Sequence, residues 1–218
     1  MFLADKYRPK GLADIVGQPG PVRFMRNLVA APQRCCLLFE SPVGGCGKTA
    51  SAHALAAELG CHDEFTGRWQ FPCSEFTVDA ARELFGRTLR LRWDNPSGFS
   101  VLILEEMDWL SPQTARFLKV ALDPAGSMPQ RLVVCATSNG AGGLDAALLQ
   151  RFRLFSFSSG PTFAAACHER LASIWAAEAG DAEMPAGWQR WGFRGEGFSM
   201  RLALAALEDS LLAKAVAA

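Results

Sequence analysis

The pattern of hydrophobic and polar positions divides the first two thirds of the chain into short apolar runs and longer helical segments. Short apolar runs bounded by turn residues are typical of buried strands in a parallel sheet. The predicted strands cover 35–40, about 71–75, 100–106, 131–139 and 153–157. The predicted helices, which have helical spacing or strong helix formers, cover 20–31, 48–59, 79–91, 111–122 and 145–151. Strands that alternate with helices predict a parallel five-stranded α/β sheet with crossover helices on its faces.

The character of the chain changes at Ser158-Ser159-Gly160-Pro161. No strand-like run follows. Residues 161–179 and 200–217 are rich in Ala and Leu and are predicted helices, separated by a stretch with tryptophan and glycine. We therefore predict an α/β core over residues 1–159 and a small all-helical domain over residues 160–218.

Composition narrows the class of protein. The chain has 218 residues, of which 50% are hydrophobic and 20% are charged, as in globular proteins. Its formal net charge is zero, which gives no support for attraction of the whole molecule to nucleic acid or to membranes, although local patches remain open. The N-terminus has no signal-peptide pattern, and no apolar run approaches the ~20 residues that span a bilayer. We expect a cytoplasmic protein that does not contact membranes.

The seven cysteines raise two further questions, redox state and metal binding. They are scattered singly apart from Cys35-Cys36, which favours reduced thiols. Cys61, His62 and Cys73 suggest zinc, but no C-x-x-C pair supports that reading, so ordinary thiols are favoured.

The sequence ESPVGGCGKTA (40–50) resembles the phosphate-loop pattern G-x-x-x-x-G-K-[ST], with Pro42 in place of the first glycine. Such a loop presents backbone N–H groups at a helix N-terminus to the phosphates. Its lysine neutralises phosphate charge and its hydroxyl holds Mg²⁺. Gly45, Gly47, Lys48 and Thr49 supply these parts. The alternative is a glycine-rich turn with a surface lysine. The apolar run before the loop and the alanine-rich helix after it favour a site for ATP and Mg²⁺.

Two carboxylates, Glu105 and Glu106, end the apolar run 100–104. A phosphate loop needs such a pair, one to orient Mg²⁺ through water and one to activate the attacking water. We assign the metal role to Glu105 and the catalytic role to Glu106. The usual residue at the first position is Asp, so Glu105 is one methylene longer. The alternative is that both glutamates merely end a buried strand.

The segment KYRPKGLADIVGQ (6–18) resembles the N-terminal segment of clamp-loader ATPase subunits, the AAA+ proteins that open sliding clamps in DNA replication. The likeness continues in order through further motifs: the phosphate loop, EEMD (105–108), VVCATSN (133–139), LLQRFRLFSF (148–157) and EGFSMRLALAALE (196–208). Phage members of this family can carry Ser-Pro at the start of the loop, as here. The resemblance implies an AAA+ P-loop NTPase core followed by a helical lid.

The resemblance also implies site residues. Asn139 ends the sensor-1 strand, Arg201 is sensor 2, and Arg151 is the finger that reaches the ATP of a neighbouring subunit. Gln150 and Phe152 beside Arg151 depart from the Ser-Arg-Cys pattern of the family. The alternatives are surface arginines, at a helix end for Arg151 and on an amphipathic helix for Arg201. The nucleotide-binding residues that the resemblance implies are Tyr7, Arg8, Val16, Gly44, Gly45, Cys46, Gly47, Lys48, Thr49 and Ala50.

The resemblance implies partners as well: copies of this chain or other AAA+ subunits in a ring or spiral, DNA, and a sliding clamp. Subunits of that family carry a third, helical collar domain, whereas this sequence stops at Ala218. We therefore expect a minimal module that assembles through its ATP interfaces or with a partner.

The predicted helix over 79–91 and the residues after it are rich in arginine, which could follow DNA phosphates. The alternative is an ordinary solvated helix face. The candidates for DNA contact are Arg82, Arg87, Arg90, Arg92, Arg116 and Lys119.

Two other functions remain open from the sequence. One is an AAA+ ATPase that remodels branched DNA or assists transposition or plasmid maintenance. The other is an ATP-binding scaffold with little hydrolysis, which Glu105 and Pro42 leave possible.

Overall fold

The structure, a computed structural model, describes residues 2–180, 182–195 and 197–217. Five parallel strands form one sheet in the order β2-β3-β4-β1-β5. The strands are β1 (Cys35–Glu40), β2 (Arg68–Pro72), β3 (Ser100–Glu105), β4 (Leu132–Ser138) and β5 (Arg153–Ser156). The predicted parallel five-stranded α/β sheet is confirmed.

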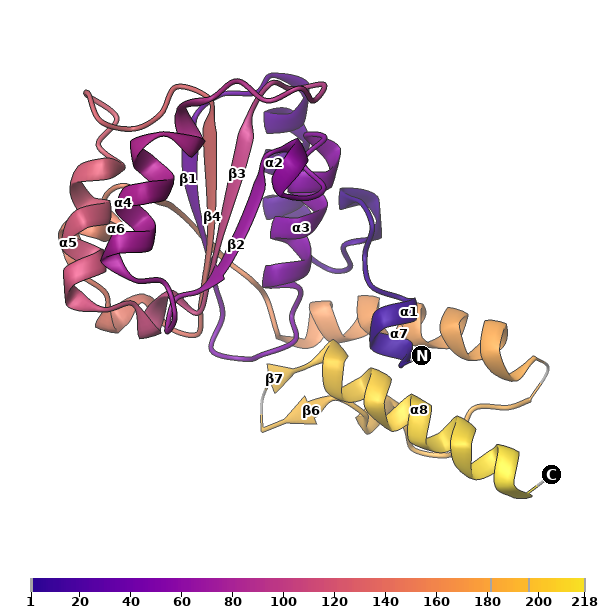
Figure 1. Cartoon of the computed structure of the whole chain (residues 1–218). Helices are drawn as coiled ribbons and strands as arrows, with labels where there is room; N and C mark the ends of the chain where they lie inside the picture. The colour runs from indigo at the N-terminus through magenta and orange to yellow at the C-terminus, as the bar shows by residue number, and fades with distance from the viewer. Residues whose placement is uncertain (1, 181, 196, 218) are drawn as a thin grey trace.

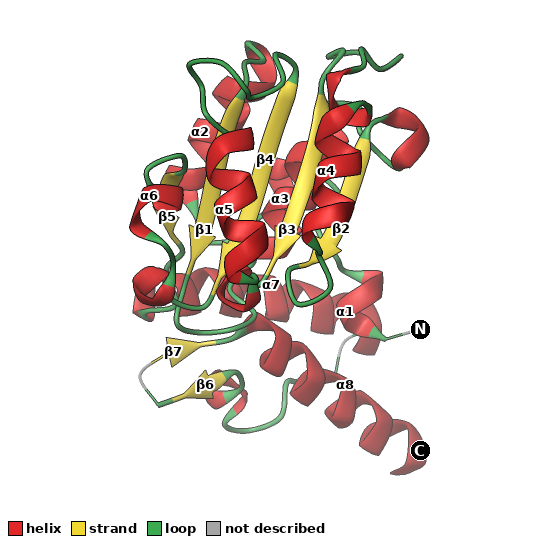
Figure 2. Ribbon diagram, turned by 60° about the vertical axis from the view of Figure 1, so that its left-hand side comes forward, coloured by secondary structure: helices red, strands yellow, loops and turns green. Residues whose placement is uncertain are grey.

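Helices cover both faces of the sheet (Figures 1 and 2). On one face lie α2 (Pro19–Ala30) and α3 (Lys48–Glu58), and on the other α4 (Val78–Gly86), α5 (Pro112–Ala121) and α6 (Ala146–Leu149). Side chains alternate between the two faces along each strand: Phe39 and Ile103 pack in the core beneath α3, while Leu38 and Leu102 pack in the core beneath α4 and α5. Because both faces are buried, the strands read as continuous apolar runs in the sequence.

The carboxyl ends of the parallel strands meet at one edge of the sheet, which faces α7 (Pro161–Ala179) and α8 (Met200–Ala217) (Figure 1). The phosphate loop follows β1 at this edge, and Glu105 and Asn139 stand at the ends of β3 and β4. Ligands of open α/β sheets bind outside the carboxyl ends of the strands, so the fold gathers the predicted chemistry at one place.

The C-terminal region from α7 to α8, which we call the lid, is mainly helical as predicted, but it is not all-helical. A two-stranded antiparallel hairpin, β6 (Phe193–Arg194) and β7 (Gly197–Phe198), lies between its two helices. Phe193 pairs with Phe198, and both rings pack around His168 of α7. Strands of two residues are too short to leave an alternating pattern in the sequence.

Two other elements differ from the prediction. β2 lies at Arg68–Pro72 rather than at about 71–75, because buried Trp69 belongs to the strand and Cys73 follows its end. The helix predicted over 79–91 ends at Gly86, and a short 3-10 turn, Thr88–Arg90, follows it. Glycine is a poor helix former, and the next residue leaves helical dihedral angles. The arginines of this region therefore do not share one helix face.

The lid packs directly on the phosphate loop. Gly45 has φ +81°, and a Cβ placed on it would lie 2.3 Å from Oγ of Ser199 and 2.9 Å from Cβ of Arg201. The N–H of Met200 donates to the carbonyl of Gly45 at 3.1 Å. Only glycine fits a left-handed position at such close approach. The loop and the start of α8 are thus in van der Waals contact.

The N-terminal segment also contacts the phosphate loop and the residues that lead into the lid. Gln18 donates from Nε2 to the carbonyls of Cys46 and Ser158, at 3.2 and 2.8 Å, and accepts from the N–H of Ser158 at 3.0 Å. One short helix, α1 (Leu3–Lys6), lies beside α8. The predicted boundary between a core over 1–159 and a lid over 160–218 stays a prediction. No helix in the described ranges is long and apolar enough to cross a membrane.

Candidate nucleotide-binding site

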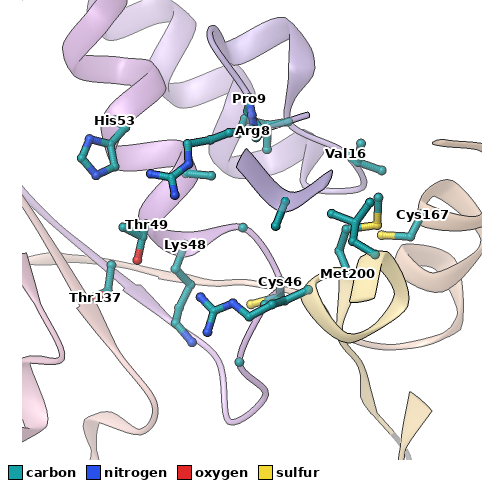
Figure 3. A pocket seen from close by; sticks show the side chains of 18 of the residues that line it. Arg8, Pro9, Val16, Cys46, Lys48, Thr49, His53, Thr137, Cys167 and Met200 are labelled. Atoms are coloured by element: carbon teal, nitrogen blue, oxygen red, sulfur yellow. The ribbon is translucent and has the colours of Figure 1, made fainter. Parts of the chain in front are cut away.

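A cavity of about 810 Å³ lies between the carboxyl edge of the sheet, the N-terminal segment and the lid (Figure 3). Its lining includes every residue for which the sequence predicts nucleotide binding: Tyr7, Arg8, Val16, and Gly44 through Ala50. Glu105, Glu106, Asn139 and Arg201 line it too. The structure therefore brings together residues from five distant parts of the chain, and this volume suits a nucleotide.

The phosphate loop closes around the amine of Lys48. Gly45 and Gly47 have φ +81° and +97°, and Gly47 caps the N-terminus of α3. Nζ of Lys48 donates to the carbonyl of Ser41 and to Oδ1 of Asn139, both at 3.0 Å. Free N–H groups at the start of a helix bind anions. The loop thus has the conformation that a phosphate site requires, although Pro42 replaces the first glycine.

Burial lowers the pKa of Lys48, whose side chain is almost enclosed. Loss of water disfavours the charged amine, and a bound phosphate would restore a partner for that charge. The site is therefore electrostatically suited to an anion.

The carboxylate pair takes two different conformations. Glu105 ends β3, and its Oε1 accepts a hydrogen bond from Nε2 of Gln70 on β2. Glu106 has φ +54° and is the one non-glycine residue with positive φ in the described chain. Its N–H donates to Oγ1 of Thr137 at 3.1 Å. A left-handed non-glycine residue costs about 1–3 kcal/mol and is typical of functional sites. The exposed Glu106 side chain lines the cavity at this point.

Asp108 supports the site through hydrogen bonds, although no role was predicted for it from the sequence. Its carboxylate accepts hydrogen bonds from Oγ of Ser138 and, at 2.9 Å, from the N–H of Asn139. It therefore fixes the end of β4, so that the amide of Asn139 meets Lys48. Asp108 belongs to the motif EEMD, and its position just after Glu105 and Glu106 is the sequence feature that could have indicated a role for it.

The other end of the cavity is more apolar. Cys167 and Met200 line it beside Val16, whereas Pro9 and His53 lie nearer to Arg8 (Figure 3). The sequence did not predict Pro9, His53, Cys167 or Met200. The lid residues among them stand on helices rich in apolar residues, and the sequence alone does not distinguish a cavity-lining position there from a core position.

Tyr7 is held at the same end by the lid. Its hydroxyl donates to the carboxylate of Glu178, which also pairs with Nζ of Lys6 at 2.5 Å. The guanidinium of Arg170 lies 5.7 Å from the Tyr7 ring centroid. The hydrogen bond to Glu178 raises the pKa of Tyr7, so its hydroxyl stays protonated. These contacts tie the N-terminal segment to α7 across the cavity.

The residues that the sequence assigns to Mg²⁺, Thr49 and Glu105, both line the cavity beside the phosphate loop. Mg²⁺ commonly takes only one or two protein ligands and completes its shell with water and phosphate oxygens. The donor set is therefore compatible with a nucleotide-bound magnesium ion. Within the described ranges no group of three His, Cys, Asp or Glu residues could hold a metal ion by itself.

Cys61 and Cys73, the two cysteines that suggested zinc, are ordinary buried thiols. Burial raises the pKa of Cys61 to about 11 and that of Cys73 to about 12. A zinc ligand must be a thiolate, and these environments disfavour one.

Arg151 lies outside the cavity. Its Nη2 is 3.7 Å from Oδ2 of Asp123, and its Nε donates to the carbonyl of Lys119 at 3.4 Å. The residues for which the sequence suggests DNA contact also lie outside it. Two of them form ion pairs, Arg82 with Asp79 and Lys119 with Asp145.

Residues 37–159, more than half of the chain, match the family described as ATPase family associated with various cellular activities (AAA). The chain belongs to this AAA ATPase family. Its fold, with the phosphate loop after β1 and paired carboxylates at the end of β3, agrees with that membership.

Curated relatives include replication factor C subunits. The small subunit of Thermoplasma volcanium is 30% identical over 141 residues, which are 62% of this chain and 42% of the relative. Replication factor C subunit 3 of Saccharomyces cerevisiae is 27% identical over 171 residues, which are 78% of this chain and 48% of the relative. The matched part is thus less than half of each of these two relatives. These matches confirm the resemblance to clamp-loader subunits that the sequence motifs predicted.

Solved structures with the same fold include the RuvB Holliday junction branch migration motor of Thermotoga maritima. The TM-score is 0.68 with 20% sequence identity, covering 93% of this chain and 64% of that chain. At this identity the likeness shows the fold alone. It extends over both the sheet and the lid of the AAA chain.

Substitution of Lys48 by alanine is expected to abolish ATP binding by this AAA chain, because the cavity would lose the cation that the loop encloses. Removing one partner of a charged hydrogen bond to a phosphate is costly in a partly buried site. Titration calorimetry with ATP and Mg²⁺ measures the change. The variant Lys10→Ala, at an exposed position outside the lining of the cavity, serves as the charge-matched control. Normal affinity in Lys48→Ala would contradict the assignment of the loop.

Proposed function

We propose that this chain is a clamp-loader-like AAA+ ATPase that binds and hydrolyses ATP at subunit interfaces and acts on DNA or on a sliding clamp. The observation that carries the proposal is the separation of Arg151 from the other polar and charged groups of the predicted site. Lys48, Glu106, Asn139 and Arg201 share one cavity, whereas Arg151 lies outside it. A neighbouring subunit could supply that second catalytic arginine.

The residues of the chain would divide the chemistry as follows. Backbone N–H groups of the loop and the Lys48 amine bind the phosphates. Thr49 and Glu105 would hold Mg²⁺, which neutralises charge on the phosphate oxygens. Glu106 accepts a proton from the attacking water, and Asn139 orients that water. The left-handed backbone at Glu106, with its N–H held by Thr137, aims the carboxylate at the cavity.

The lid would couple the nucleotide to the rest of an assembly. The start of α8 touches Gly45, and Arg201 in its first turn lines the cavity. Hydrolysis of ATP would change the contacts that the phosphates make with the loop and with Arg201. The lid would therefore change its angle relative to the sheet during the ATPase cycle. Such motion is the usual output of domain closure around a ligand.

The proposed DNA or clamp partner rests on the replication factor C relatives and on the segment 6–18. The same fold occurs in a branch migration motor, but a shared fold does not show that two proteins act on the same substrate. Stimulation of ATP turnover by primed DNA, and further stimulation by a sliding clamp, would support the clamp-loader role. Stimulation by branched DNA alone would favour remodelling. An ATP-binding chain with no turnover under any of these conditions would be a scaffold.

The variant Glu106→Gln is expected to bind ATP with nearly normal affinity and to lose hydrolysis. The amide is close in size but does not accept a proton from water. Phosphate release under single-turnover conditions measures the effect, with Glu105→Gln as the matched variant. A larger loss in Glu105→Gln, with Glu106→Gln active, would show that the two roles are reversed.

The variant Arg151→Ala should retain ATP binding and lose hydrolysis if its guanidinium acts in the neighbouring site. An arginine finger contributes about 10³–10⁵ in rate. The decisive measurement mixes two inactive proteins, Arg151→Ala and Glu106→Gln. In a mixed assembly, a site is complete when the Arg151→Ala subunit binds ATP beside its intact Glu106 and the neighbouring Glu106→Gln subunit provides its intact Arg151.

Partial recovery of ATPase activity on mixing therefore supports catalysis between subunits. Absence of recovery in a demonstrated mixed assembly would refute it. The wild-type control is the dependence of specific activity on protein concentration, which should rise with assembly. Constant specific activity on dilution to a monomer would mean that one subunit suffices.

A further inference from the structure

A second cavity, of about 250 Å³, opens at the amino ends of the strands and contains three arginines. Its lining is Arg90, Arg92, Gly126, Met128, Pro129, Gln130 and Arg131. Arg131 immediately precedes β4, and the stretch with Arg90 and Arg92 comes before β3. In Figure 1 the amino ends of the strands lie at the edge of the sheet away from α7 and α8. The arginine hollow (Arg90, Arg92 and Arg131) is therefore at the edge opposite to the nucleotide cavity.

The guanidinium groups of Arg92 and Arg131 lie close together over Gly98. A Cβ placed on Gly98 would be 3.3 Å from Nη1 of Arg131 and 3.5 Å from Nε of Arg92. Gly98 is buried and has φ +66°, a backbone conformation that favours glycine. The turn therefore lets both side chains approach a single point at the surface.

Arg90 is held in place by the backbone. Its Nε donates to the carbonyl of Phe85 at 3.1 Å, and its Nη2 donates to the carbonyl of Ser127 at 3.3 Å. Since a guanidinium has five N–H donors, these contacts leave donors available for a ligand. The orientation of Arg90 is consequently fixed before any ligand arrives.

Within the described ranges, none of these three arginines pairs with a carboxylate. Other basic residues do, such as Arg82 with Asp79 and Arg151 with Asp123. The exposed Asp94, two residues after Arg92, makes no described ion pair either. Neighbouring like charges repel one another, so an anion bound between them would be stabilised. In a chain of zero formal net charge, this unpaired cluster is a local positive site.

We infer that the arginine hollow binds phosphate groups, those of a nucleic-acid backbone or those of a free polyphosphate. Phosphate fits better than a single carboxylate, because three cations match a multiply charged group and guanidinium forks bind phosphate oxygens in pairs. The hollow is separate from the ATP site and includes Arg131, a residue that the sequence did not suggest. The inference goes beyond the proposed ATPase function, and each can fail without the other.

Binding of a fluorescein-labelled single strand and of a labelled duplex, followed by anisotropy at several salt concentrations, tests the nucleic-acid source. Titration calorimetry with inorganic pyrophosphate tests the free anion. Saturating ADP and Mg²⁺ keep the phosphate loop occupied in both. The test variant is Arg92→Gln/Arg131→Gln. The matched control is Arg23→Gln/Arg26→Gln, which removes the same charge from exposed positions of α2.

The test variant should bind DNA about ten-fold more weakly per arginine at 0.1 M salt, and its slope of log K against log salt should fall by about 2. The control should remain close to the wild type. Loss of pyrophosphate binding with unchanged DNA binding would assign the hollow to a free phosphate. Unchanged binding of both would overturn the inference.

Thermal melting and ADP affinity report whether the double variant is folded. Should it melt early, Arg92→Gln and Arg131→Gln alone provide the same test, each with a ten-fold effect and a slope change of about 1. ATP turnover is not measured in this experiment. A folded double variant with normal DNA and pyrophosphate binding would therefore reject the arginine hollow as a phosphate site without bearing on the proposed ATPase.

Discussion

The hydrogen bonds of the buried Lys48 amine are the interaction on which the site depends. This one cation joins the phosphate loop, through Ser41, to the end of β4, through Asn139. Asp108 completes the connection, because it fixes the backbone of Asn139. Burial disfavours the charge of Lys48, and a bound phosphate compensates it. Nucleotide binding would thus replace contacts within the protein by contacts to the ligand, and both the loop and the sensor strand would respond.

The second constraint is the close contact between the loop and the lid. Gly45 leaves no room for a side chain beside Ser199, and Gln18 ties the loop to the chain segment that enters the lid. The nucleotide cavity is therefore a joint between core and lid rather than a pocket in either one. In our proposal this joint lets ATP hydrolysis move the lid, while the trans position of Arg151 makes hydrolysis depend on a neighbour.

Sequence reasoning predicted the sheet well because strands buried on both faces are continuous apolar runs, as in CCLLFE and SVLILE. The phosphate loop was also predictable, since glycines and a lysine have fixed chemical roles there. Four features were not. The hairpin at Phe193–Phe198 is too short to show a period. The lid residues Cys167 and Met200 look like core. The helix after Thr77 ends at Gly86, and Arg87 leaves helical dihedral angles, although helix formers continue beyond it; a single glycine within such a run does not by itself mark a helix end. Asp108 acts through a contact across the sheet that no local pattern reveals.

Hydrogen–deuterium exchange of the wild type with and without ADP and Mg²⁺ tests most directly whether core and lid form one nucleotide site. Exchange at backbone amides slows where a ligand fixes hydrogen bonds or closes a joint. Our account predicts protection in peptides covering 43–50, 4–16 and 199–205 together, and none of it in Lys48→Ala. Protection restricted to 43–50, with unchanged exchange at 199–205, would contradict the account, because the lid would then take no part in holding the nucleotide.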